Sequence, residues 1–429
     1  METTQNNKSI YKNYRDRFLG IRIANIFSLI FGTIVLFSVL FEFPLIGVVT
    51  SRKLCLIACL VYLFFNFNRC KEVFSNVSST KVLLFISCLF VCFLISLWNS
   101  VSIITPGNNV YVEPYYYLQV IIYVLVFSNS FVLLFRDVKC FAFSYIAIML
   151  FEAIVVFIAA GDSSFRLMLY DNFYVGDDRF DSTIMWGTRI IGVFLHSSTG
   201  SIILAIACIL LIYLRLCKAI SIVPFIAFYA TIVAATFLIG RTGFYLELAL
   251  FVLYLLMEKR VSSKVVILAG VVVALVFVIN GVLSGLNSTI SNLIFSWATE
   301  LFNEETRSNT ISNLASMSIP SFSSELIFGT NISLGTLPNG ELMTSDSGYA
   351  KTYCEIGVVG FAFFYVGLAF LLTSTRFKLM NRKGIFIYVL LLVAFILEIK
   401  EPYFLKYVYL IAVFTLLLFN SKENMSIES

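Results

Sequence analysis

The sequence predicts an all-α integral membrane protein with about twelve spanning helices, and three observations support this fold class. The 429-residue chain is 59% hydrophobic and only 13% charged, whereas a soluble domain carries about 25% charged residues. Apolar runs long enough to cross a bilayer recur along the chain. Lysine and arginine gather in alternate connections between these runs. We therefore expect one polytopic membrane domain over residues 1–429.

The spans are predicted from runs of about 20 mainly apolar residues, the length that crosses the hydrocarbon core. A polar, basic segment without a small-residue cleavage site precedes the first run, so we expect that helix to be retained. The second and eighth runs are short. In chain order the segments are roughly 23–43, 54–68, 82–98, 115–135, 140–160, 190–214, 219–239, 242–257, 265–283, 352–373, 384–399 and 403–419.

Orientation follows from the lysine and arginine residues, which favour cytoplasmic connections. With the N-terminus in the cytoplasm, an even number of spans returns the C-terminus there. Outer connections then contain few lysines, apart from Lys53, Lys351 and Lys400, and Arg52 is a local exception. The inner connections hold Arg69, Lys71, Lys81, Arg136, Lys139, Arg215, Lys218, Lys259, Arg260, Lys264, Arg376, Lys378, Arg382 and Lys383.

An arginine lies near the middle of the apolar run 219–257, which is too long for one span. The sequence "GRTG" (Gly240 to Gly243) predicts a tight outer turn, because glycine permits a backbone reversal. Arg241 then lies at the outer surface, where the charge bias disfavours a cation. It could bind a ligand there, or its long side chain could extend to lipid phosphates.

Two outer connections are long enough to carry function. Residues 161–189 mix aspartates with arginines, including Arg189, and could largely pair among themselves. The longest connection, 284–351, lies between the ninth and tenth spans; an excursion of that length is usually functional. It begins with a predicted amphipathic helix on the membrane surface, continues past Arg307, and ends at Asp346, a candidate N-cap of the tenth span.

Several functional classes are excluded by missing patterns. The nine cysteines lie in or beside apolar runs without a CxxC pair, so we expect neither a disulfide framework nor a metal site. The small net charge of +5 belongs to the cytoplasmic side and does not indicate nucleic-acid binding. No P-loop, GxSxG or HExxH motif is present, and no cofactor is expected. His196, Glu152 and Glu247 are read as intramembrane residues with unassigned partners.

The layout resembles the Wzy-type bacterial O-antigen and exopolysaccharide polymerases, which are related to the O-antigen ligases. The similarity lies in the span number, the two outer loops, and four segments: "GRTG", "EETRSN", "DSGYAKTYCEIGVVGF" and "EIKEPYF". It implies a GT-C-like, metal-independent glycosyltransferase of the bacterial inner membrane with an extracytoplasmic active site. Its substrates would be undecaprenyl-pyrophosphate-linked glycans, and its partners membrane lipid, a chain-length regulator and a flippase.

The resemblance also implies site residues, and elementary chemistry agrees with them. A permanently charged guanidinium binds phosphate oxygens in a bidentate way, which suits a diphosphate leaving group. We expect Arg241 first and Arg307 second to act as catalytic diphosphate-binding residues, with Arg189 as a third candidate from the sequence alone. Asp346 and Tyr349 would lie near the acceptor or organise the loop. Arg307 could instead be a solvated loop charge, and Asp346 only a helix cap.

Two other functions stay open. A lipid-linked oligosaccharide flippase would have a similar span number, but transporters tend to show repeated halves and short loops. An O-antigen ligase would carry a histidine in the large loop, which this chain lacks. The general base of a polymerase, if one is used, is not identified by the sequence.

Overall fold

The computed structural model describes residues 23–46, 49–75, 77–102, 112–173, 190, 192–193, 197–258, 260–284, 320–332, 335–337, 342–343, 345, 347–374 and 392–428. Arg189, Arg307 and Asp346 lie outside the described residues, as does the predicted amphipathic helix. His196 does so as well, and only the backbone of Arg241 is described.

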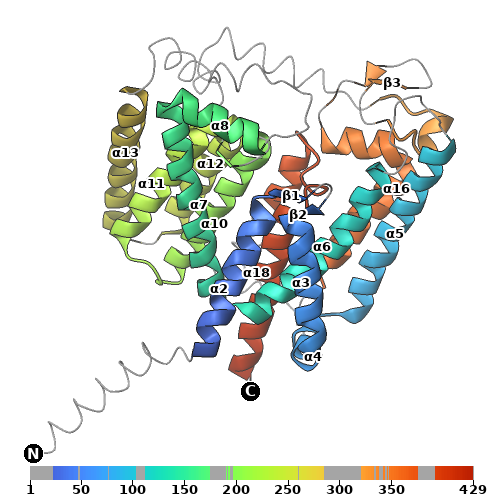
Figure 1. The fold of residues 1–429 in the computed structure, drawn as a ribbon, viewed down its shortest axis with the longest axis horizontal. Helices are drawn as coiled ribbons and strands as arrows, with labels where there is room; N and C mark the ends of the chain where they lie inside the picture. The colour runs from blue at the N-terminus through green and yellow to red at the C-terminus, as the bar shows by residue number, and fades with distance from the viewer. Residues whose placement is uncertain are drawn as a thin grey trace, which may run out of the picture.

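The described chain is almost entirely helical (Figure 1). One further helical stretch covers residues 392–398. The elements are α2 (Ile23–Leu40), β1 (Pro44–Ile46), β2 (Val49–Thr50), α3 (Ser51–Phe65), α4 (Phe67–Ser75), α5 (Ser79–Ser102), α6 (Val112–Leu134), α7 (Val138–Gly161), α8 (Ser163–Phe173), α10 (Ser197–Leu216), α11 (Ile222–Ile239), α12 (Arg241–Met257), α13 (Val261–Ser284), η2 (Ser324–Ile327), β3 (Gly335–Thr336), β4 (Leu342–Met343), α16 (Gly348–Leu372) and α18 (Val408–Glu428).

The predicted all-helical class is confirmed, and the long apolar helices are compatible with the predicted membrane protein. Six helices are long and apolar enough to cross a membrane, or up to seven when the bent pair α3 and α4 counts as one span. Each predicted span overlaps a helix of the described residues. The number that cross a membrane remains a prediction, because several of these helices are shorter than a full span.

Several predicted spans differ from the structure in their boundaries. The last, 403–419, corresponds to α18 (Val408–Glu428), because residues 403–407 are not helical. The predicted second span, 54–68, corresponds to the short helix α3, which turns by 92° into α4. For the predicted span 190–214, the described helix is α10, which begins at Ser197, and residues 190, 192 and 193 are not helical. The backbone N–H of Val193 instead donates to the buried Glu152 carboxylate at 2.9 and 3.2 Å. Gly192 allows this approach, since a Cβ there would lie 2.1 Å from a Glu152 oxygen.

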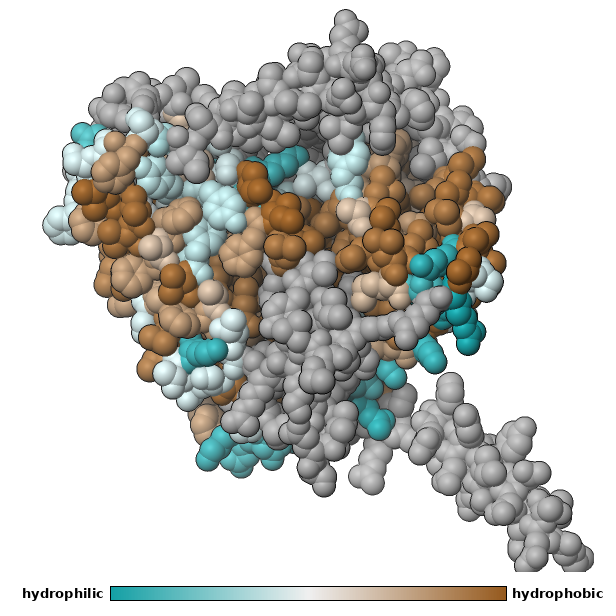
Figure 2. Space-filling model, turned by 180° about the vertical axis from the view of Figure 1, so that it is seen from behind, coloured by the Kyte–Doolittle hydropathy of each residue, from teal (hydrophilic) through white to brown (hydrophobic). Residues whose placement is uncertain are grey.

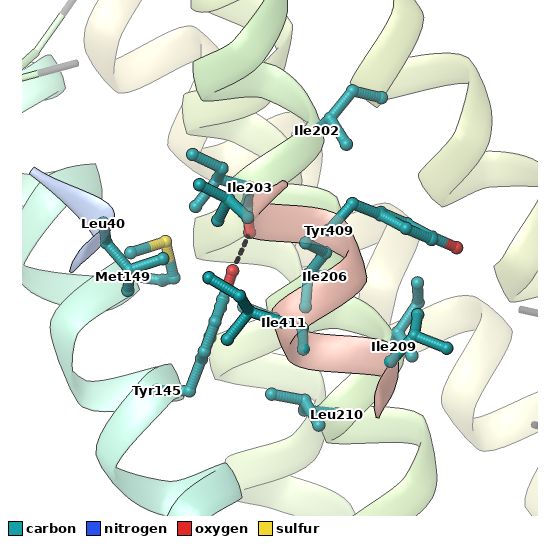
Figure 3. Close-up of a cluster of buried hydrophobic side chains, with 14 of the residues drawn as sticks. Leu40, Tyr145, Met149, Ile202, Ile203, Ile206, Ile209, Leu210, Tyr409 and Ile411 are labelled. Atoms are coloured by element: carbon teal, nitrogen blue, oxygen red, sulfur yellow. Dashed lines mark hydrogen bonds between the residues drawn. The ribbon is translucent and has the colours of Figure 1, made fainter. Parts of the chain in front are cut away.

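Helix α10 is the centre of one group of helices, which also contains α7, α11, α12 and α13. It is buried nearly all round, as expected for a helix that is hydrophobic on every face. Figure 3 shows isoleucines of α10 packed against α7 and α18, with the Tyr145 hydroxyl donating to the Ile203 carbonyl at 3.0 Å. A second group contains α5, α6 and α16, and α18 contacts both groups.

The outward-facing side chains of many helices are apolar. Figure 2 shows brown hydrophobic residues over much of the described surface, with hydrophilic residues in smaller groups. Phe65 and Val223, for example, are 79% and 76% exposed. Such a surface exceeds what a soluble monomer exposes and suits contact with lipid.

The β1–β2 hairpin lies where α2 ends and α3 begins, and this side of the bundle is here called the hairpin end. In Figure 1 it lies opposite the marked C-terminus, which follows α18. The strands are antiparallel, and Ser51 closes the hairpin by exchanging hydrogen bonds with Phe43 at 2.8 and 2.9 Å. Because α2 ends and α3 begins here, this end corresponds to the predicted outer side of the membrane.

Helix α8 accounts for the described part of the first long connection. Asp162 caps it by accepting from the N–H groups of Ser164 and Phe165, at 2.8 and 3.2 Å. Arg166 turns back and donates to the Ala159 carbonyl at 3.1 Å, satisfying the end of α7. Burial lowers the pKa of the Arg166 guanidinium below its ordinary value, and Asp162 opposes that shift. Arg166 therefore serves local structure.

Candidate functional site

Three segments that are far apart in the sequence meet near the hairpin end. They are the start of α12, the start of α16, and residues 399–407, here called the bend, which link the helix of residues 392–398 to α18. The Lys400 ammonium donates to the Thr242 hydroxyl at the start of α12. Gly348 at the start of α16 lies so close to the bend that a Cβ would approach the Pro402 Cα to 2.7 Å. These are the "GRTG", "DSGY" and "EIKEPYF" segments of the sequence.

The predicted "GRTG" turn is confirmed, but the predicted reason for its glycines is wrong. A single residue, Gly240, links α11 to α12, with φ −166° and ψ 134°. This extended backbone is open to any residue. Gly243 is required for another reason, because a Cβ there would lie 2.2 Å from the Ser201 carbonyl oxygen of α10. The turn depends on close helix packing rather than on a left-handed glycine.

Gly243→Ala is therefore expected to lower thermal stability. The added methyl group must push α12 away from α10, and overpacking of this kind costs about 1–3 kcal/mol. Gly161→Ala is the matched control, since a Cβ at Gly161 meets nothing within 4 Å. Thermal unfolding in detergent, followed by size-exclusion chromatography, measures both variants. Equal midpoints for the two would show that the α10–α12 contact is not tight.

Arg241 is the first residue of α12 and is adjacent to Thr242. Its backbone therefore lies beside the Lys400 contact, although its side chain lies outside the described residues. Gly240 has no side chain to cap this helix. Positive charge from the α12 dipole and the Lys400 ammonium consequently gathers at the residue predicted to bind diphosphate.

The chain after Arg189 approaches the same turn. The Ile190 N–H donates to the Leu238 carbonyl near the end of α11, at 3.1 Å. Leu238 is two residues before Gly240. Arg189 itself lies outside the described residues, so its role stays a prediction.

Tyr349 uses its hydroxyl to hold two helices together. It donates to the Phe395 carbonyl at 2.9 Å. Its ring packs 5.1 Å from Tyr365 and 6.2 Å from Phe361. In the described structure Tyr349 organises the start of α16, and its contact with an acceptor sugar remains a prediction.

Glu398 fixes the beginning of the bend and was not predicted as a site residue. It is fully buried and accepts from the Tyr365 hydroxyl and from the Phe404 N–H, both at 3.1 Å. Gly348 leaves room for it, since a Cβ there would lie 2.5 Å from its carboxylate. Because both oxygens are engaged inside the protein, Glu398 supports the bend and is not placed to contact substrate.

The bend also carries a charged pair and a buried tyrosine. Lys406 pairs with Glu401 at 2.5 Å and lies 4.9 Å from the centre of the Tyr403 ring. The buried Tyr403 hydroxyl lies beside Thr242 and forms no hydrogen bond of standard geometry with the described residues. Thr242 therefore has two polar neighbours from the bend, Lys400 and Tyr403.

Lys400 and Thr242 were missed as candidates by sequence reasoning. The available signal was the position of Lys400, which is one of the few lysines in the predicted outer connections. Its contact with Thr242 spans 158 positions in the sequence, so periodicity and spacing do not reveal it.

The intramembrane acids Glu152 and Glu247 accept hydrogen bonds from other segments of the chain. Glu152 binds the Val193 backbone, as described above. Glu247 accepts from the Thr236 hydroxyl at 2.8 Å and the Cys208 thiol at 3.5 Å, and its other oxygen finds no partner among the described residues. Glu152 thus connects α7 to the segment before α10, and Glu247 connects α12 to α10 and α11.

Helix α16 contains a break that receives another part of the chain. Gly357 has φ 70° and ψ −176°, which interrupts the helix. The carbonyl groups of Cys354 and Glu355 accept from the N–H groups of Thr330 and Asn331, at 2.8 and 3.0 Å. Asn99 of α5 also donates to the Glu355 carbonyl, at 3.1 Å. The late part of the long connection 284–351 is thereby docked into α16.

No family model, no curated protein and no solved structure matches this chain. Within the described residues, no group of three or more His, Cys, Asp or Glu side chains could hold a metal ion. The fold defines the class as an all-helical, membrane-spanning protein with apolar helices suited to lipid contact.

Proposed function

We propose that this protein polymerises undecaprenyl-pyrophosphate-linked oligosaccharide repeat units into O-antigen or a related surface polysaccharide. The observation that carries the proposal is the contact of Lys400 with Thr242. It joins two of the segments that resemble the polymerase family beside Arg241, and the close approach of Gly348 to Pro402 adds the third. Separate roles for these segments would not require them to meet.

The proposed reaction transfers a growing glycan from its lipid diphosphate to a hydroxyl group of another repeat unit. The acceptor oxygen bonds to the anomeric carbon as the bond from that carbon to the diphosphate oxygen breaks. Undecaprenyl pyrophosphate leaves with the developing negative charge, and the proton of the acceptor hydroxyl passes to the leaving diphosphate or to water. Arg241 and Lys400 would offset the leaving-group charge, and preorganised electrostatic stabilisation is often the largest catalytic contribution.

The remaining predicted residues complete this proposal. Arg307 and Arg189 would add cations to the diphosphate side, and Asp346 and Tyr349 would line or organise the acceptor side. The protein would work with a flippase that supplies repeat units and with a chain-length regulator. No metal is assigned a role in the transfer.

The proposed setting is the outer face of the bacterial inner membrane, with about twelve spans in a GT-C-like arrangement and both termini in the cytoplasm. In support, α2 begins and α18 ends on the side away from the hairpin. Cysteine substitutions at Lys53 and Lys264 test this arrangement with a membrane-impermeant maleimide. Labelling of position 53 alone in intact cells agrees with it, and labelling of position 264 alone reverses it.

The direct test incubates the purified protein with synthetic undecaprenyl-pyrophosphate-linked repeat units. The expected result is a ladder of longer lipid-linked glycans together with release of undecaprenyl pyrophosphate. Intact single units after incubation, with folded protein confirmed by size-exclusion chromatography, would reject polymerase activity.

Lys400→Ala is expected to raise the KM for the lipid-linked donor about tenfold, the effect of losing one hydrogen bond to a charged group. Lys264→Ala, on the predicted cytoplasmic side, is the matched control and should leave KM unchanged. Initial rates over a range of donor concentrations give both values. An unchanged KM in the Lys400 variant would remove Lys400 from the diphosphate site.

One observation favours a flippase as the second candidate. Discontinuous helices such as α16 form the substrate sites of many transporters. The two functions predict different products when the protein is lost from cells. Single repeat units accumulate outside if a polymerase is missing, and inside if a flippase is missing. An O-antigen ligase would instead leave finished long chains on the lipid carrier.

A further inference from the structure

A buried arginine lies where the charge bias disfavours one. Arg52, in the first turn of α3, is 7% exposed. Its Nε and Nη2 atoms donate to the Val39 carbonyl at 3.0 and 2.8 Å, and its Nη1 atom donates to the Glu42 carboxylate and the Tyr407 hydroxyl. Glu42 also accepts from Thr50 at 2.8 Å. Arg52, Glu42 and Tyr407 are here called the Arg52 clamp.

The cost of this arrangement indicates a role beyond stability. Removing two charges from water is expensive, and well-packed apolar residues of similar volume often stabilise a protein as much or more. A buried ion pair is better suited to selecting one conformation among several. The segment that the Arg52 clamp selects is the bend, because Tyr407 is its last residue.

Tyr407 has an unfavourable backbone that needs external support. Its φ is 37°, in the left-handed region that a bulky side chain rarely adopts. The Arg52 guanidinium carbon lies 5.2 Å from the centre of its ring, and the Tyr123 ring packs against it at 4.8 Å. Such backbone strain persists only where surrounding contacts enforce it. Here those contacts come from α3 and α6.

The two ends of the bend are thus fixed by different elements. Glu398 holds the beginning through Phe404, and Arg52 holds the end through Tyr407. Lys400 lies between them and reaches Thr242. Without the Arg52 clamp the bend could relax, and the Lys400 ammonium would no longer be directed to the start of α12.

We propose that Arg52 is a positioning residue, which acts through Tyr407 to hold Lys400 beside the start of α12. The role in catalysis rests on the proposed function, whereas the effect on the position of Lys400 does not. Arg52 contacts no substrate in this mechanism. Its effect on the reaction passes through the bend.

The test measures the position of residue 400 directly. Cysteines replace Thr242 and Lys400 in a chain whose nine native cysteines are changed to alanine, and a short bis-maleimide joins them. Arg52→Lys keeps the charge but removes the forked donors. Tyr407→Phe keeps the ring but removes the hydroxyl. Each change is expected to slow cross-linking about tenfold, as for loss of one hydrogen bond to a charged group.

Arg166→Lys is the matched control, since Arg166 is similarly buried but bonds only locally within the described residues of α7 and α8. It should leave the cross-linking rate unchanged. Size-exclusion chromatography establishes which variants are folded, and Tyr407→Phe provides the test if Arg52→Lys does not fold. An unchanged cross-linking rate in folded Tyr407→Phe overturns the proposal.

Kinetics separate this proposal from the proposed function. If both are right, Arg52→Lys and Tyr407→Phe also lower polymer synthesis when they are made in a chain that keeps Thr242 and Lys400. Slower cross-linking in a protein that forms no polymer even as wild type would retain the positioning role and reject the polymerase. A normal cross-linking rate in the folded variants of a protein that does form polymer would reject the positioning role and retain the polymerase.

Discussion

Replacing Arg241 with alanine is expected to abolish long-chain glycan while the protein stays folded in the membrane. The residue begins α12 beside the Lys400–Thr242 contact, where cationic charge would meet a diphosphate. Losing one preorganised donor of this kind costs on the order of 10²–10³ in rate. Gel electrophoresis of lipid-linked glycans from cells, and the reconstituted reaction, measure the loss. Arg307→Ala should give the same result if both arginines bind the diphosphate.

Arg241→Lys distinguishes geometry from charge. A lysine keeps the positive charge but lacks the planar pair of donors, so we expect most of the activity to be lost here too. Arg260→Ala and Arg260→Lys are matched controls, because Arg260 is exposed and lies before α13, at the far end of α12. Wild-type chain lengths in the Arg241 variants would reject the assignment. Full activity in Arg241→Lys alone would reduce its role to a point charge.

The helices could be predicted because their signal is local. An apolar run of sufficient length specifies a membrane helix wherever its neighbours lie. The predicted run 140–160 thus appears as α7 and 352–373 as α16, with errors of only a few residues. One exception is the predicted span 190–214. Residues 190, 192 and 193 are not helical, and the Val193 N–H donates to Glu152, 41 positions earlier, rather than within a helix.

The candidate site could be predicted only in part, since its contacts join distant segments. The "GRTG" turn was predicted from the length of the apolar run and from its glycines, yet the need for Gly243 arises from Ser201 on another helix. Arg52 violated the charge bias, and only the structure supplies its partners Glu42 and Tyr407. A charge in an unexpected place is thus an informative signal from the sequence, but the sequence does not show which residue pairs with it.

Gly357→Ala is expected to produce a large structural effect. A side chain at φ 70° is strained, and its Cβ would lie 2.4 Å from the Ile327 carbonyl oxygen and the Gly329 nitrogen. Strain of this kind alone costs about 1–3 kcal/mol, and the contacts add an overpacking cost. The docked segment would have to leave α16, which would expose the carbonyl groups that Thr330 and Asn331 now satisfy.

Two measurements check this expectation. The thermal midpoint should fall relative to Gly161→Ala, whose added Cβ meets open space. A cysteine placed at Thr330, which is 1% exposed, should react with a maleimide much faster in the Gly357→Ala background. An unchanged midpoint together with slow labelling would mean that α16 accepts alanine at position 357 and still holds the docked segment. Loss of polymer synthesis in folded Gly357→Ala would further connect the docked end of the long loop to the reaction. In that case the loop and the bend, held by different helices, would both have to be in place for the diphosphate and the acceptor to meet.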